Sequence, residues 1–127
     1  MSERARICLV DDDIFVRDAI ALGLRDLGYT VKVAPGAMAG SDLIQHNEID
    51  ALVTDLRMPG ASGAQLIAEA RARWPTMPII AISGASHVEG LSVIDAARAL
   101  GANALLTKPF RASELATALD KLLAQPA

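Results

Sequence analysis

The stretch ICLVDDD (residues 7–13) decides the fold, because four consecutive apolar residues run directly into three carboxylates. A short, continuous apolar run is typical of a strand that is covered on both faces by other elements. Acids crowded at the end of such a strand are costly, since two unit charges about 4 Å apart repel by about 1 kcal/mol in water and about 4 kcal/mol near a protein surface. Asp11, Asp12 and Asp13 therefore call for a compensating group at this end of the strand.

Four further runs repeat the strand signal, and helical spacings of apolar residues separate them. Three of the runs resemble the first in being continuously apolar, whereas YTVKV (29–33) alternates and indicates a strand nearer an edge. The three are DALVTD (50–55), MPIIAIS (77–83) and ANALLT (102–107).

Five helices fit between and after these runs. The weakest helix signal is residues 36–47, where two glycines and a serine lower the helix propensity. Gly28 and Gly101 stand where helix C-terminal caps belong. Alternating strands and helices predict an α/β fold, a doubly wound five-stranded parallel sheet with five helices, as a single domain over residues 1–127.

Composition narrows the class of protein. The chain has 127 residues, a formal net charge of −3 and a single cysteine, Cys8, in the middle of the first strand. The charge argues against nucleic acid as a direct partner, and one cysteine excludes an internal disulfide and suits a reducing compartment. Without an apolar run near the ~20 residues that cross a bilayer, or a signal peptide, we expect a cytoplasmic protein that does not enter a membrane. Cys8 is expected to be a plain core residue, and Trp74 to pack at the end of a helix.

Chemically useful side chains converge at one edge of the predicted sheet, because ligands of open parallel α/β sheets bind beyond the carboxyl ends of the strands. Four strand ends supply acids, a hydroxyl and an ammonium group: Asp11 to Asp13, Asp55, Ser83 and Lys108. Clustered carboxylates suit a hard cation such as Mg²⁺ (or Mn²⁺), and a cation with a lysine makes a phosphoryl group on one acid tolerable. The cluster therefore indicates a metal-assisted aspartyl-phosphorylation site.

The motifs that carry these residues resemble the receiver domain of two-component response regulators over essentially the whole chain. They are VDDD (10–13), TDLRMPGASG (54–63), IIAISGAS (79–86) and GANALLTKPF (101–110). The resemblance implies a flavodoxin-like sheet with strand order 2-1-3-4-5. It also implies a phosphorylatable switch of a phosphorelay, which takes its phosphoryl group from a histidine kinase or phosphotransfer protein and is an enzyme only toward its own aspartyl phosphate.

The resemblance assigns roles residue by residue. Asp55 matches the phosphoacceptor. The metal ligands of the family correspond to Asp12, which would bind the ion directly, Asp11, which would bind it through water, Asp55 itself and the backbone carbonyl of Arg57. Ser83 matches the hydroxyl and Lys108 the lysine that contact the phosphoryl group, and the Lys108–Pro109 bond is cis in the family. Asp13 has no fixed family role and is as well explained as a helix cap.

The sequence departs from the family pattern in two places. Leu105 stands where an aromatic switch residue is usual, so we expect the signal to leave through the loop after residues 77–83 and the fourth helix. That loop, GASHVEG (84–90), is about three residues longer than usual and is expected to be mobile. Positions Arg57, Ala85 and Ser86 are expected to tune the lifetime of the phosphoryl group.

No output domain follows in the sequence, so the chain is expected to act as a stand-alone regulator, similar to chemotaxis regulators, through protein contacts. The family's usual contact surface is made by the fourth helix, the fifth strand and the fifth helix, and a homodimer could form there. Its candidate exposed residues are Glu89, Asp95, Arg98, Arg111 and Lys121.

Three other interpretations fit the sequence less well. A small aspartate phosphatase of the haloacid dehalogenase kind would use Asp11 and Asp13, but Phe15 stands where that family has Thr or Val, and Asp55 is left unexplained. A flavin-binding domain of similar topology needs a first turn rich in Gly, Ser and Thr, and here that turn is acidic. A receiver-like module that works without phosphorylation has only Leu105 in its favour.

Overall fold

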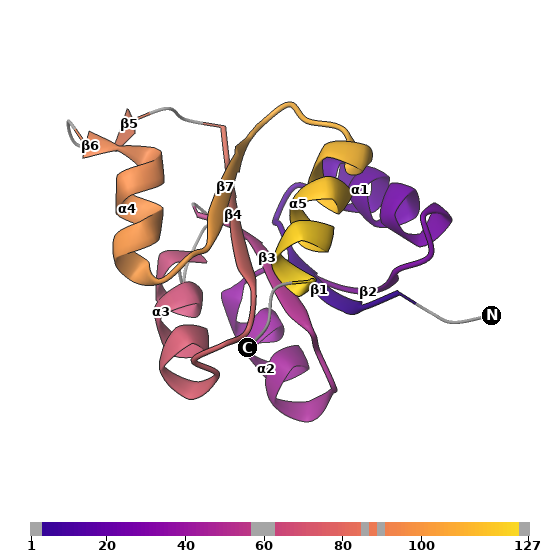
Figure 1. Ribbon diagram of the computed structural model, residues 1–127, viewed down its shortest axis with the longest axis horizontal. Helices are drawn as coiled ribbons and strands as arrows, with labels where there is room; N and C mark the ends of the chain where they lie inside the picture. The colour runs from indigo at the N-terminus through magenta and orange to yellow at the C-terminus, as the bar shows by residue number, and fades with distance from the viewer. Residues whose placement is uncertain (1–3, 57–62, 85–86, 89–90, 125–127) are drawn as a thin grey trace.

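The computed structural model describes residues 4–56, 63–84, 87–88 and 91–124. Five parallel strands form its central sheet, in the order β2-β1-β3-β4-β7 (Figure 1). The strands are β1 (Arg6–Val10), β2 (Thr30–Ala34), β3 (Ala51–Asp55), β4 (Ile79–Ser83) and β7 (Ala104–Thr107). Counting only the strands of this sheet, the order is 2-1-3-4-5, so the predicted doubly wound topology is confirmed.

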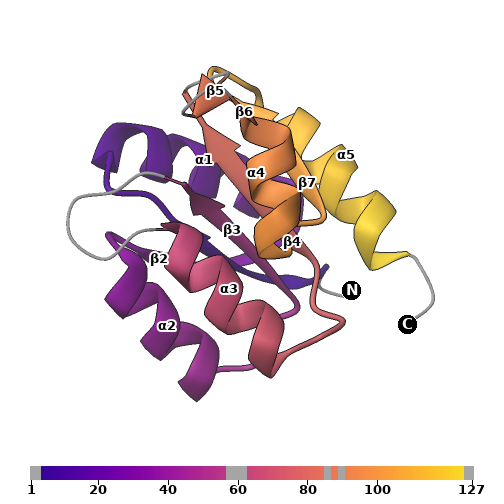
Figure 2. The same ribbon diagram turned by 90° about the vertical axis from the view of Figure 1, so that its left-hand side faces the viewer.

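Helices cover both faces of the sheet (Figures 1 and 2). They are α1 (Ile14–Asp26), α2 (Ala37–His46), α3 (Gly63–Arg73), α4 (Val93–Leu100) and α5 (Ala112–Leu123). One hydrophobic cluster joins the sheet to α1 and α5, and a second joins it to α2, α3 and α4. No helix in the described part of the chain is both long enough and apolar enough to span a membrane.

The two clusters divide the side chains of each buried strand between them. In β1, Ile7 and Leu9 lie in the cluster with α1 and α5, whereas Cys8 and Val10 lie in the cluster with α2, α3 and α4. All four side chains are fully buried, and every residue of β3 and β4 is buried too. Successive residues of a strand point to opposite faces, so a continuous apolar run is what a sheet between two helical layers requires. Cys8 is a core residue, as predicted.

The sheet edges match the sequence at one side only. β2 lies at one edge, as the alternating pattern of YTVKV predicted. β7 lies at the other edge, and its residues are half-buried, with Thr107 exposed. The prediction of a fully buried strand at 102–107 was therefore wrong in its burial, because β7 has a neighbouring strand on one side only.

A second, two-stranded antiparallel sheet follows β4, and the sequence did not predict it. It pairs β5 (His87–Val88) with β6 (Leu91–Ser92) immediately before α4 (Figure 1). The predicted loop at 84–90 thus contains strand residues. Residues 85–86 and 89–90 of the loop, Glu89 among them, lie outside the described residues, so the mobility expected of residues 84–90 stays a prediction.

Two glycines end helices with a left-handed backbone, as predicted: Gly28 with φ +99° after α1 and Gly101 with φ +114° after α4. The α2 helix forms despite its weak propensity, and its glycine has a packing role. A Cβ on Gly40 would lie 2.7 Å from Cγ2 of Val10, so only glycine lets α2 come this close to β1. Trp74, directly after α3, packs against the cluster on that face, as expected of a helix-end residue.

Candidate functional site

Three carboxylates meet beyond the carboxyl ends of β1 and β3. Asp11 and Asp12 follow β1 directly, and Asp55 is the last residue of β3. One carboxylate oxygen from each lies within 4.8 Å of the others. Asp11 is completely buried and Asp55 is 7% exposed, whereas Asp12 is open to solvent. The predicted convergence of acids at this edge of the sheet is therefore present.

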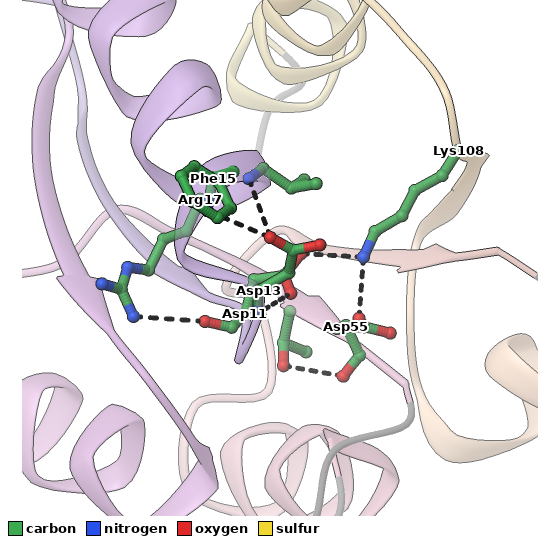
Figure 3. Close-up of polar contacts among 8 residues, drawn as sticks. Asp11, Asp13, Phe15, Arg17, Asp55 and Lys108 are labelled. Atoms are coloured by element: carbon green, nitrogen blue, oxygen red, sulfur yellow. Dashed lines mark hydrogen bonds and ion pairs between the residues drawn. The ribbon is translucent and has the colours of Figure 1, made fainter.

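Lys108 bridges two of the three acids from the end of β7 (Figure 3). Its Nζ lies 2.9 Å from Oδ2 of Asp55, to which it donates a hydrogen bond, and 2.9 Å from Oδ2 of Asp11 in an ion pair. Burial lowers the pKa of Lys108, but the contacts with Asp55 and Asp11 more than offset this effect, so the pKa is raised above its ordinary value. The lysine is thus held as a cation between two buried carboxylates.

The backbone and a second cation fix Asp11 in place. The N–H of Asp13 donates to Oδ1 of Asp11 (2.9 Å), and Nη1 of Arg17 donates to its carbonyl oxygen (3.4 Å). Arg17 and Lys108 approach Asp11 from opposite sides (Figure 3). Asp11 therefore has its orientation set by contacts that leave Oδ2 directed toward Lys108 and Asp55.

Asp13 has a different task from its two neighbours. Its carboxylate accepts hydrogen bonds from the backbone N–H groups of Phe15 (3.0 Å) and Val16 (3.2 Å), and so caps the N-terminus of α1. It does not belong to the group of acids that could hold a metal. A phosphatase that used Asp11 and Asp13 as its catalytic pair would need a carboxylate that is here engaged in the helix cap.

The remaining predicted site residues lie on the same edge where the structure describes them. Ser83 is buried at the end of β4, and its carbonyl oxygen accepts a hydrogen bond from the N–H of Lys108 (2.8 Å). The Lys108–Pro109 bond is cis. Leu105 is half-buried and packs on the side of α2, α3 and α4. Arg57, the predicted backbone ligand, lies outside the described residues, as do Ala85 and Ser86.

Sequence reasoning gave no role to two residues that contact the end of β3, the strand that carries Asp55. The backbone of Gly63, at the start of α3, lies so close to the carbonyl oxygen of Asp55 that any Cβ would overlap it. The same carbonyl accepts a hydrogen bond from Oγ1 of the buried Thr54 (3.0 Å). The signal for Gly63 was its place in TDLRMPGASG, where glycine also suits a simple turn.

The donor set fits a hard divalent cation. Carboxylate oxygens at this spacing are what Mg²⁺ takes from proteins, together with waters. Among the described residues, the buried Oδ2 of Asp11 accepts no hydrogen bond, and its ion pair with Lys108 is its one charged contact there. A buried carboxylate oxygen with spare acceptor capacity beside two more carboxylates is consistent with a cation site.

The predicted contact surface is described in part. Four of its five candidate residues are exposed, on α4 and on or beside α5: Asp95, Arg98, Arg111 and Lys121.

Residues 7–120 match the family model of the response regulator receiver domain. The chain is 34% identical to response regulator MprA of Mycobacterium sp. (strain KMS) over 119 residues, which are 93% of this chain and 50% of that protein. It is 30% identical to transcriptional regulatory protein QseB of Escherichia coli O157:H7, covering 93% of this chain and 52% of that one. The chain thus spans about half the length of these curated relatives.

Solved structures agree with the sequence relatives. A putative response regulator from Chloroflexus aurantiacus J-10-fl superimposes with a TM-score of 0.87 at 30% identity, covering 97% of this chain and all of that one. The chemotaxis response regulator CheY4 of Vibrio cholerae gives a TM-score of 0.82 at 26% identity, covering 93% of this chain and 98% of that one.

Proposed function

Because the chain belongs to the response regulator receiver family, the signalling switches of two-component systems, we propose that it accepts a phosphoryl group on Asp55 from a histidine kinase or phosphotransfer protein. Phosphorylation then changes its affinity for a protein partner. The observation that carries the proposal is the placement of Lys108 2.9 Å from carboxylate oxygens of both Asp11 and Asp55, with Asp12 within metal-ligand reach. A single acid or a single lysine would not support phosphoryl transfer, because the transfer needs a carboxylate to accept the group and positive charge to stabilise it.

The proposed transfer is an in-line displacement. An oxygen of the Asp55 carboxylate attacks phosphorus, a P–O bond forms, and the P–N bond to the donor imidazole breaks, leaving the electron pair on the nitrogen. Lys108 loses its pairing with Asp55 as the carboxylate becomes an acyl phosphate, and its ammonium group then pairs with a phosphoryl oxygen. Ser83 donates a hydrogen bond to a second phosphoryl oxygen.

A cation completes the charge balance. Mg²⁺ (or Mn²⁺), held by the carboxylates of Asp11, Asp12 and Asp55 and the backbone carbonyl of Arg57, would neutralise negative charge on the phosphoryl oxygens. The contact of Asp13 N–H with Asp11 keeps that carboxylate oriented for this role. Slow hydrolysis of the acyl phosphate by water resets the switch.

The wider parts of the proposal follow from this chemistry. Residues 1–127 work as one receiver domain in the cytoplasm, where the donor kinase presents its phosphohistidine. The downstream partner, or a second copy of the chain, binds the face made by α4, β7 and α5, and nucleic acid is not contacted directly. Because Leu105 has no ring to rotate, the change reaches this face through the segment between Ser83 and α4.

The decisive experiment is intact-protein mass spectrometry after incubation with Mg²⁺ and acetyl phosphate, with Asp55→Asn as the test variant and Asp26→Asn as its control. Asp26 is an exposed carboxylate at the far end of α1, so its amide variant should behave as the parent. We expect one added phosphoryl group on the parent and on Asp26→Asn, and none on Asp55→Asn or in the presence of EDTA.

A second donor decides the case in which acetyl phosphate gives no adduct. Phosphorylated histidine phosphotransfer domains should then transfer to the parent and not to Asp55→Asn. If neither kind of donor modifies the parent while Mg²⁺ binding is confirmed by titration, the chain works without phosphorylation and the proposal is wrong.

A further inference from the structure

The valley between α2 and α3 is an open groove that the phosphoryl chemistry does not use. The two helices lie side by side on one face of the sheet (Figures 1 and 2). Two adjoining cavities of about 240 and 220 Å³ run along them and share Ser41, Leu66 and Glu69. The first contains Met38, near the carboxyl end of β2, and the second ends at Trp74. We call this continuous feature the α2–α3 groove.

The sequence of α2 makes the groove. Gly40 lets the helix lie close to Val10 and Leu66, because a Cβ at this position would be 2.7 Å from the valine and 3.1 Å from the leucine. The residues of α2 that line the groove beside it, Ala37 and Ser41, have small side chains. The valley between the two helices is therefore not filled by large side chains of α2 at this point, and its apolar floor, which includes Leu66, is buried beneath polar walls.

Charge is distributed unevenly along the groove. Asp42 on α2 and Glu69 on α3 line the same cavity from opposite walls, and within the described ranges neither carboxylate has an ion-pair partner. Four residues beyond Glu69, roughly 6 Å along the helix axis, Arg73 lies over the ring of Trp74, with its guanidinium 5.1 Å from the ring centroid. Both carboxylates line the cavity beside Met38, whereas Arg73 lies at the Trp74 end of the second cavity, which Glu69 also lines.

An exposed apolar side chain lines the first cavity as well. Met38 is 77% exposed, one of the largest departures from burial among the hydrophobic residues of the described chain. Methionine is flexible and polarisable, and it is used at surfaces that adapt to a partner helix. Met38 thus places an exposed apolar side chain beside Asp42 and Glu69, two carboxylates that form no ion pair within the described part of the chain.

We propose that the α2–α3 groove docks a basic amphipathic helix of a partner protein. A Lys or Arg of that helix lies between Asp42 and Glu69, while a neighbouring apolar side chain packs on the exposed Met38. The ten residues of α2, about 15 Å long, accommodate roughly three turns of such a helix. Charge complementarity sets its direction, because a basic side chain at the Arg73 end would be repelled.

The test uses a synthetic helical peptide of about 14 residues, roughly 21 Å long, with leucine and alanine on one face and lysine on its flanks. A second peptide carries glutamate in place of every lysine. Amide chemical shifts of the ¹⁵N-labelled protein are followed during titration at low salt, with saturating Mg²⁺ to neutralise the acidic site and with no phosphodonor. The readout is therefore independent of whether Asp55 can be phosphorylated.

The lysine peptide should shift amides of residues 37–46 and 65–74, and the glutamate peptide should not. Asp42→Asn and Glu69→Gln should each weaken binding about two- to fivefold, as for exposed charge pairs, and Met38→Ala by about fivefold or more. Asp26→Asn should bind as the parent. Shifts confined to other surfaces, equal binding of both peptides, or groove variants that bind as tightly as Asp26→Asn would overturn the proposal.

Discussion

Replacing Lys108 by methionine tests how much the lysine stabilises the cluster of carboxylates when no metal ion is bound. The side chain keeps its length and apolar stem but loses the charge that lies 2.9 Å from both Asp11 and Asp55. At an effective dielectric of about 20, each contact corresponds to about 6 kcal/mol of Coulomb attraction. Most of this is offset by the desolvation and ordering of the lysine, which is 21% exposed.

Removing one partner of a buried ion pair costs about 3–5 kcal/mol. Lys108 keeps some contact with solvent, so the expected loss lies at the lower end of this range. We therefore expect Lys108→Met to lower the free energy of unfolding in EDTA by about 3 kcal/mol, with a melting temperature about 10 °C lower.

Urea unfolding followed by circular dichroism measures the loss, with Lys32→Met as the matched control. Lys32 is exposed on the edge strand β2 and has no ion-pair partner in the described part of the chain. The deficit of Lys108→Met should shrink with saturating Mg²⁺, because the metal ion replaces the missing positive charge between the carboxylates. It should also shrink when Asp55→Asn is added, because one of the two orphaned charges is then absent.

The reasoning would be refuted by a deficit in EDTA within about 0.5 kcal/mol of the Lys32→Met value, the usual range for surface substitutions. It would equally fail if Asp55→Asn left the deficit of Lys108→Met unchanged, because the cost would then lie in packing and not in unpaired carboxylates.

Two further predictions concern Gly63 and the two buried side chains with raised pKa values, Tyr29 and Cys8. Gly63→Ala should lower the free energy of unfolding by about 2–3 kcal/mol through overpacking and should slow phosphorylation from acetyl phosphate, because its Cβ would overlap the Asp55 carbonyl. Gly36→Ala, which has open space around it, should have neither effect. Equal urea unfolding midpoints for the two variants would contradict this prediction. Burial, helped by the hydrogen bond to Asp120, raises the pKa of Tyr29 from 10.0 to about 12, and burial raises the pKa of Cys8 from 9.0 to about 12. As pH rises, the unfolded chain therefore loses these protons before the folded chain does. The free energy of unfolding should fall as pH rises from about 9 to 12. In urea titrations across this range Tyr29→Phe should lose stability less steeply above pH 10, and a slope equal to that of the parent would count against the assignment.

Much of the fold could be predicted because burial on two faces leaves a mark in the sequence. The runs at β1, β3 and β4 are continuously apolar since each side chain enters one of two cores, and their ends place the acids together. The edge position of β2 was visible because Lys32 interrupts its apolar residues.

The burial of β7 was mispredicted for a physical reason. Helices cover both faces of this strand, so Leu105 and Leu106 are apolar as in a central strand, yet the missing neighbour on one side leaves them half-exposed. The apolar residues of a strand indicate that helices cover both faces of the sheet there. They say little about whether the strand has a hydrogen-bonded neighbour on each side. The β5–β6 pair escaped prediction because two-residue strands carry no periodicity.

At the site, residue type was a better guide than local role. Three identical aspartates follow β1, and only the start of α1 separates Asp13, a helix cap, from Asp11 and Asp12. Gly63 was hidden because a glycine pressed against a carbonyl and a glycine in a turn look alike in sequence. The contact between Gly63 and Asp55 joins residues that meet only after folding, whereas Asp13 caps the helix that begins at the next residue, a local role that the sequence had already offered for it.

The place of Cys8 in the sheet gives the folded chain a built-in chemical reporter. It is the single cysteine of the sequence, it lies in β1 with strands on either side, and none of its surface is accessible. Its raised pKa also keeps the thiol protonated, so an alkylating reagent meets neither an accessible sulfur nor a thiolate in the native state. Alkylation of Cys8 requires the strands of the central sheet to separate, so its rate measures how often the whole core opens. A cysteine introduced on any exposed helix position could likewise be coupled to a dye without protecting the native one.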